Sequence, residues 1–230
     1  MADTKKTNDA PEALEVRGLG EAAVLKYRNV IIGVIAAIVV CLGVAFFVKN
    51  CTQEQFNTSS TEMAKAQEFF MRAVADEDSL LYEKALNGDS INSGFLAIAE
   101  GASSGKVANL AKLYAGLCYA HLGNMQEATT YLEQFDTADD AMVSPAAIGA
   151  LGDVKASMDQ LDEAAALFVK AAEKADNNSL SPLFLIKAGE ILESQGKKAE
   201  ALKLYEQIKS KYANSPQYRT IDAYIERAKE

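Results

Sequence analysis

The sequence predicts an all-α protein in which a single transmembrane helix precedes an α-solenoid of helix-turn-helix repeats, closed by a C-terminal capping helix. Three observations support this fold class. An uncharged apolar run occupies residues 30–48. The 230-residue chain has only four prolines and is rich in Ala, Leu, Glu and Lys, which favours helix. Finally, a set of small and bulky residues recurs three times at intervals of 36 and 37 residues.

The apolar run predicts one membrane span. As a helix, residues 30–48 extend roughly 28 Å, which matches the hydrocarbon core of a bilayer. We place the transmembrane helix at 21–50, with its core at 30–48, and expect residues 1–20 to be a disordered tail. Five basic residues precede the run and one follows it closely, so the tail is expected in the cytoplasm and the longer C-terminal part outside.

One face of the predicted span carries small residues at every fourth position: Gly33, Ala37, Cys41 and Ala45. Such a stripe lets a second helix approach closely. That helix belongs either to a partner or to a second copy of this chain, so a homo-dimer is one of the states left open. The redox state of Cys51, at the outer edge of the span, is open too.

Charge and composition narrow the function classes. With 23 basic and 32 acidic residues the formal net charge is −9, which argues against nucleic-acid binding, since that needs an excess of Lys and Arg. One histidine and three scattered cysteines provide no zinc ligand set and no local disulfide pair. We therefore expect no metal, no cofactor and no small-molecule substrate.

The region after the span begins with a polar stretch, residues 51–60, which we expect to be a linker. Residues 61–105 follow, with apolar side chains at helical spacing and breaks at 76–78, 88 and 103–105. Ser60 or Thr61 is expected to cap the first helix there. The pattern predicts one or two degenerate repeat units.

Residues 106–215 contain the clear repeat. Three glycines align, and the same offsets align three alanines and then three bulky residues. A large side chain also follows the first glycine by three residues. These positions are Gly116, Gly152 and Gly189; Ala128, Ala164 and Ala201; Leu132, Phe168 and Tyr205; and Tyr119.

The pattern resembles the tetratricopeptide repeat, a helix-turn-helix unit of about 34 residues. The copies are expected at about 109–143, 145–180 and 182–215, followed by the capping helix at 216–230. The resemblance implies that helices touch at the small residues while the bulky ones fill the space between units. The turn glycine is met by Gly123 and Gly196, whereas Asp159 departs from it in the middle copy.

No part of the sequence predicts catalysis. The stretch 101–106 has glycines and a lysine but lacks the spacing of a phosphate-binding loop, and His121 has no evident nucleophile partner. We expect the acidic runs at 76–78 and 139–140 to be solvated loops or helix starts. The chain is therefore expected not to be an enzyme.

The repeat resemblance implies a groove, formed by the first helices of the units, that binds a protein partner. Such a groove would begin apolar and become acidic, without the Lys and Asn residues that clamp a terminal carboxylate in chaperone-binding members. For Leu113 and Leu117, packing against the preceding helices is an equal alternative. The expected groove residues are Leu110, Leu113, Leu117, His121, Asp153, Ala156, Ile186, Glu190 and Glu193.

A basic inner tail, one span and an outward repeat domain together resemble the YfgM-type ancillary subunits of the bacterial Sec translocon. This resemblance implies a single-pass protein of the bacterial inner membrane, with a periplasmic repeat domain that links the translocon to periplasmic chaperones. Residues 94–124 are also similar to repeat proteins of the Bacteroidetes. We therefore expect a non-catalytic scaffold with protein partners.

The sequence is also compatible with three other hypotheses. The chain could be an adaptor of another envelope assembly, such as one for cytochrome c maturation, cell division or secretion. It could instead be a regulatory subunit of a membrane enzyme, or its topology could be inverted. The identity of the partner, the oligomeric state and the choice between a helical and an extended ligand are also undecided.

Overall fold

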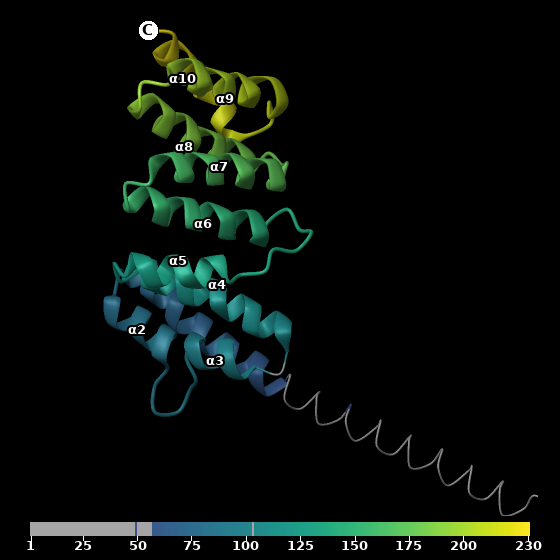
Figure 1. Ribbon diagram of the computed structural model, residues 1–230. Coiled ribbons are helices and arrows are strands. Elements are labelled where there is room, and N and C mark those ends of the chain that lie inside the picture. Colours follow the sequence, from purple (N-terminus) through teal and green to yellow (C-terminus); the bar gives the residue numbers. More distant parts are fainter. Residues whose placement is uncertain (1–48, 50–56, 103) are drawn as a thin grey trace, which may run out of the picture. The chain divides into compact units, whose positions relative to one another are not determined.

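The computed structural model describes residues 49, 57–102 and 104–230, and the described residues from Asn57 to Glu230 belong to one compact unit (Figure 1). Within the described residues, the regular elements are helices, and the only strand-like feature is an isolated bridge between Gly88 and Ser93. The predicted all-α repeat fold is thereby confirmed for this unit.

Among the described residues, no helix is both long and apolar enough to cross a bilayer. The predicted span at 30–48 lies outside the described residues. So do the tail at 1–20, Cys51 and the small-residue stripe of Gly33, Ala37, Cys41 and Ala45.

The N-terminal part of the unit consists of a helix over residues 57–76, α2 (Ser79–Asn87) and α3 (Phe95–Gly101). This region differs from the prediction in one respect, because residues 57–60 are helical and not linker. The hydroxyl of Thr61 donates to the carbonyl oxygen of Asn57 at 2.9 Å, a bond that runs back along the helix axis. Thr61 therefore lies inside the helix and does not cap its start.

Three helix pairs and a closing helix follow, and each helix packs against its neighbour in sequence (Figure 1). Their bounds lie close to the three predicted copies and the predicted cap. The pairs are α4 (Gly105–His121) with α5 (Met125–Glu133), α6 (Val143–Ser157) with α7 (Leu161–Ala175), and α8 (Ser181–Ser194) with α9 (Lys198–Lys211); η1 (Pro216–Arg219) and α10 (Ile221–Lys229) end the chain.

The aligned residues make the same contact in every pair. A methyl group built on Gly116 would lie 2.7 Å from Leu132, on Gly152 2.9 Å from Phe168, and on Gly189 2.4 Å from Tyr205. All three distances are shorter than real carbon contacts, so the bulky residue of the second helix rests directly on the backbone of the first. The aligned alanines, Ala128, Ala164 and Ala201, are fully buried.

The turn within each pair uses the same backbone conformation. Gly123 and Gly196 have φ of 82° and 73°, and Asp159 adopts a φ of 60° at the equivalent place. Aspartate tolerates this left-handed region better than most residues. The middle copy therefore keeps the turn although it lacks the glycine.

The boundaries that follow α5, α7 and α9 are each marked by a buried serine followed by proline, a feature that the repeat alignment missed. The pairs are 144–145, 181–182 and 215–216, and they include three of the four prolines in the chain. The Ser181 hydroxyl donates to the carbonyl oxygen of Ala172 at 2.7 Å and accepts from the amide of Asn177. Proline suits this place because the first turn of a helix needs no amide hydrogen there.

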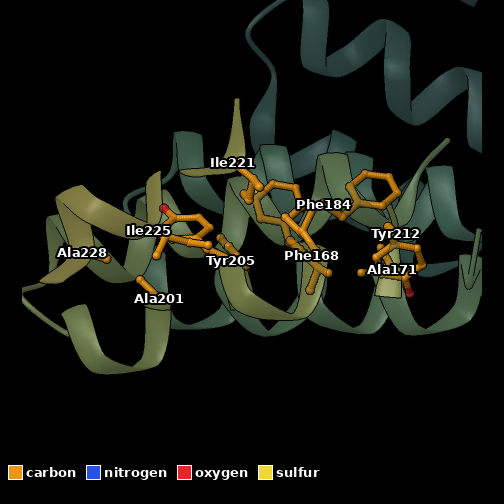
Figure 2. Packing of buried hydrophobic residues seen from close by; sticks show 14 of the residues in the cluster. Phe168, Ala171, Phe184, Ala201, Tyr205, Tyr212, Ile221, Ile225 and Ala228 are labelled. Atoms are coloured by element: carbon orange, nitrogen blue, oxygen red, sulfur yellow. The ribbon is translucent and has the colours of Figure 1, made fainter. Parts of the chain in front are cut away.

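The hydrophobic core is divided along the stack. One cluster joins the helix over 57–76, α2, α3 and α4, and a second joins α6 to α10; a smaller cluster on α4, α5 and α6 lies between them. Figure 2 shows the second cluster, in which Phe168, Phe184 and Tyr205 come from three successive helices. The closing helix α10 covers this cluster with Ile221, Ile225 and Ala228.

Candidate functional site

The surface of α4, α5 and α6 contains a hollow of about 230 Å³. Its walls are mainly apolar, and a histidine, an aspartate and a serine lie at its edge. The lining residues are Leu117, Ala120, His121, Met125, Ala150, Asp153, Val154 and Ser157. The hollow spans two repeat units, so the stacking of the units creates it.

Three of the predicted groove residues, Leu117, His121 and Asp153, meet at this hollow. Leu113 does not line it, because its side chain is only 7% exposed and packs in the small cluster with Leu132 and Val154. The structure therefore shows packing, which was the alternative prediction for Leu113. The contacts of Leu113 in this cluster are with the following helices, α5 and α6, and not with the preceding ones.

The remaining predicted groove residues are spread along α4, α6 and α8. Leu110, Ala156 and Ile186 are half-buried and pack at the margins of the core clusters. Glu190 is exposed on α8. The sequence analysis did not predict Met125, Ala150, Val154 and Ser157. An alignment of repeats places residues within one unit, but it does not show which residues line a hollow between two units.

His121 is held by aromatic rings of the N-terminal helices. Its ring stacks on Tyr82 with centroids 4.4 Å apart, and it meets the edge of Phe70 at 6.3 Å. Burial against these rings lowers the pKa of His121, because the charged imidazolium is poorly solvated there. At neutral pH the histidine side of the hollow is therefore uncharged.

Asp153 is paired with a lysine of the next unit. Lys187 Nζ donates to both carboxylate oxygens at 2.6 and 2.8 Å, and it also lies 5.2 Å from the centroid of the Phe168 ring. Both members of the ion pair remain accessible, with 55% of the Asp153 and 35% of the Lys187 side chain exposed. Sequence reasoning identified the acid but not its partner, which is 34 residues away.

Glu193 departs from the expectation of an open acidic groove. Its side chain is only 12% exposed, and its carboxylate accepts from Arg227 of α10 and, at 2.9 Å, from the hydroxyl of Tyr205. The hydrogen bond from Arg227 is the main reason why the pKa of Glu193 lies below its usual value. Glu193 thus fastens the closing helix, and its carboxylate is engaged within the chain.

The groove surface is therefore less acidic than its sequence suggests. Asp153 and Glu193 are each paired with a basic residue of a later element, while Glu190 is exposed on α8 and forms no ion pair within the described residues. The surface thus combines an apolar hollow, one carboxylate paired with a partly exposed lysine, and one further exposed carboxylate.

A second hollow, of about 390 Å³, is lined by α7, the end of α8 and the start of α9. Its floor is apolar, and its rim carries both signs of charge, including the pair of Lys197 with Asp162 at 2.6 Å. The residues that line it are Asp162, Ala165, Ala166, Val169, Lys170, Glu173, Leu192, Lys197 and Glu200. None of them belongs to the predicted groove.

Metal chemistry finds no support in the part of the chain that the structure describes, where no three His, Cys, Asp or Glu side chains gather as a metal site would require. Burial raises the pKa of the Cys118 thiol to about 12, so this cysteine is uncharged at neutral pH and a poor nucleophile.

Two family models, each described as a tetratricopeptide repeat, match residues 110–137 and 150–218. The chain contains tetratricopeptide repeats. The matched segments cover the helix pairs in which the glycine and bulky residue touch. Repeats of this kind are generally non-catalytic and act as scaffolds for protein–protein interaction.

Solved structures show the same tetratricopeptide-repeat fold. Similar chains are the nearly identical TPR-like repeats of a kinesin light chain-like protein from Podosopora anserina and a point-substituted form of them. Their TM-scores are 0.54 and 0.53, with 16% identity, and the matches cover 74% of this chain and 86% and 85% of theirs. At this identity the likeness concerns the fold alone. A comparison with curated proteins finds no significant match.

Proposed function

We propose that this protein is a membrane-anchored, non-catalytic scaffold whose repeat domain binds protein partners outside the cytoplasmic membrane. The anchor is the apolar segment 30–48, with the N-terminus in the cytoplasm and the repeats in the periplasm. In this proposal the repeats bring a periplasmic chaperone or its client close to the Sec translocon, to which the anchor binds.

The observation that carries the binding function is the hollow on α4, α5 and α6. It collects apolar side chains from two repeat units at the surface, with Asp153 and His121 at its edge. Surface hollows that combine apolar walls with a few polar groups are typical binding sites. The repeat pattern supports the same conclusion, since stacked units form extended binding surfaces.

The anchor and the pathway are supported by the sequence. The run 30–48 is uncharged and long enough for a bilayer, and basic residues dominate the segment before it. The resemblance to the YfgM-type translocon subunits rests on this arrangement of tail, span and repeats.

Site-specific photo-crosslinking in intact cells tests the proposal. Probes are placed at Leu117 in the hollow, at Glu190 on α8 and at Gly33 in the span, and a probe at the exposed Glu206 of α9 serves as the control. We expect translocon subunits from the Gly33 probe and a periplasmic chaperone or client from Leu117 and Glu190, but neither from Glu206.

Other results would change specific parts of the proposal. Recovery of a different envelope complex would keep the scaffold and replace the pathway. Cytoplasmic proteins attached at Leu117 would overturn the topology. If equal sets of proteins were attached at Leu117 and Glu206, the hollow would not be the binding surface.

A further inference from the structure

The residue that follows each repeat glycine changes its chemistry from one unit to the next. It is Leu117 in α4, Asp153 in α6 and Glu190 in α8. Leu117 and Asp153 both line the hollow, and Glu190 is exposed on the following first helix. A ligand that crosses these three helices therefore meets an apolar site, then one carboxylate, then another.

We propose that this surface selects an extended protein segment in which an apolar side chain is followed by two basic side chains. The apolar side chain enters the hollow, the first cation contacts Asp153, and the second contacts Glu190. This inference rests on the protein-binding function proposed above and adds the chemistry of the partner to it.

The hollow fits the apolar part of this segment. Five of its lining residues, Leu117, Ala120, Met125, Ala150 and Val154, are apolar. Transfer of an apolar side chain from water into such surroundings is favourable. With about 230 Å³ of space, the hollow takes a single large side chain and not a whole helix.

Asp153 already shows its preference for a cation, because Lys187 occupies it within the chain. The ammonium lies 2.6 Å from one carboxylate oxygen, and both side chains of the pair are partly exposed to solvent. Exposed ion pairs of this kind contribute little net stability, so a cation of a ligand replaces Lys187 at small cost. Lys187 is thus a competitor that occupies the site when the ligand is absent.

The geometry of the stack sets the spacing of the three contacts. Lys187 of α8 reaches Asp153 of α6, so the first helices of neighbouring units lie within side-chain reach of each other, and we take a separation of roughly 8–10 Å for them. An extended chain advances about 3.3 Å per residue. Successive contacts are therefore expected about three residues apart in the bound segment. A helix would advance only about 1.5 Å per residue and would need a longer segment with the contacts on one face.

Fluorescence anisotropy of labelled peptides, added to the full chain in a neutral detergent, tests this inference. The probe is a blocked twelve-residue peptide of Gly and Ser that carries one leucine, a lysine three residues later and an arginine three residues after that. Three control peptides change the leucine to serine, both cations to glutamine, or both cations to glutamate. We expect the probe to bind about three- to fivefold more tightly per cation than the glutamine peptide, and the glutamate peptide not to bind.

Variants of the protein locate the contacts. Lys187→Gln removes the competing cation, so it is expected to tighten binding of the probe, and Asp153→Asn is expected to weaken it by about three- to fivefold. Neither variant is expected to change the affinity for the glutamine peptide. Ala120→Phe fills the hollow and is expected to weaken every peptide that contains leucine, while Glu206→Gln on α9 is the matched surface control.

The inference is overturned if the probe and the glutamine peptide bind equally well, or if no peptide binds up to millimolar concentration. It is also overturned if Lys187→Gln weakens the probe, because Lys187 would then contact the ligand directly. These results are independent of the crosslinking experiment. If a partner is captured at Leu117 but the probe and its control peptides bind equally, the scaffold function stands and only the proposed specificity is rejected.

Discussion

At the start of α6, the carboxylate of Asp140 accepts hydrogen bonds from the amides of Met142, Val143 and Ser144, at 2.5 to 3.1 Å. The hydroxyl of the buried Ser144 donates to the same carboxylate and accepts from the amide of Ala138. The acidic pair at 139–140, expected from the sequence to be a solvated loop or a helix start, therefore includes a residue that organises the boundary between two repeats.

Loss of this carboxylate is expected to destabilise the second repeat. Asp140→Ala leaves three amides at the helix start and the Ser144 hydroxyl without their acceptor, at a cost of about 1–2 kcal/mol. Urea unfolding followed by circular dichroism measures the change. The neighbouring Asp139→Ala is the control, since Asp139 is exposed and beside the same loop; equal losses in both variants would contradict the role of Asp140.

The same site predicts a pH dependence. The bond from Ser144, together with those from the amides, lowers the pKa of Asp140 from its ordinary value of 3.8 to about 2. The native state thus favours the ionised form, so the contribution of Asp140 is complete above about pH 4 and is lost as the pH falls from there through 2. Asp140→Asn cannot ionise, so the difference in unfolding free energy between wild type and variant is expected to shrink between pH 5 and 2. A constant difference would refute this.

On the scale of helices, the contact between a glycine and a bulky ring recurs in each pair. Gly189→Ala places a methyl group 2.4 Å from the ring of Tyr205, which is fully buried and cannot move freely. We expect a loss of about 1–3 kcal/mol, measured by thermal or urea unfolding. Gly101→Ala is the matched control, because a methyl group there meets nothing within 4 Å in α3. It is expected to be neutral or to stabilise by roughly 0.5–1 kcal/mol; comparable losses in both would reject the proposed close contact.

Within the described residues, two ion pairs join the closing helix to earlier helices, Lys209 with Asp222 and Arg227 with Glu193, and only the second involves a largely buried carboxylate. Arg227→Leu leaves the Glu193 carboxylate with the Tyr205 hydroxyl as its remaining donor, in a place where it is only 12% exposed. We expect a loss of about 1–2 kcal/mol and earlier hydrogen exchange in α10 than in α7. Lys229→Leu, which removes an exposed pair within α10 with Glu226, is the control. If α10 exchanges equally slowly in both variants, the contact does not hold it.

For the described unit as a whole, stability is divided among neighbouring clusters, as in other repeat stacks. The C-terminal cluster ends on Ile221, Ile225 and Ala228 of α10, which cover Tyr205 and Ile208. Deletion of 216–230 would expose this apolar surface. We expect a lower unfolding midpoint and concentration-dependent self-association in light scattering, whereas the charge variant Glu226→Gln on α10 should remain monodisperse. A truncated chain that stays monodisperse with an unchanged midpoint would show that α10 is not a cap.

Local signals in the sequence determined much of this unit. The periodicity of apolar residues predicted the helix pairs, because one helical face must be buried, and the aligned glycines predicted where two helices touch. The turn at Asp159 could not be predicted from the expected glycine, which is missing there. The structure shows that Asp159 itself adopts the left-handed backbone conformation. Residues 57–60 show the opposite error, because polar side chains there suggested a linker although the backbone continues the helix.

The site was predictable only in part. The repeat register placed Leu117, His121 and Asp153 on the surface of the first helices, since a shared position in a repeat implies a shared face. Which carboxylates stay available was decided by the tertiary structure. Lys187 and Arg227 each pair with an acid 34 residues earlier, about one repeat away, but the repeat alignment does not show which side chains of neighbouring units touch. Ion pairs form between side chains that are close in space, so the net charge of the groove surface is known only once the units are stacked.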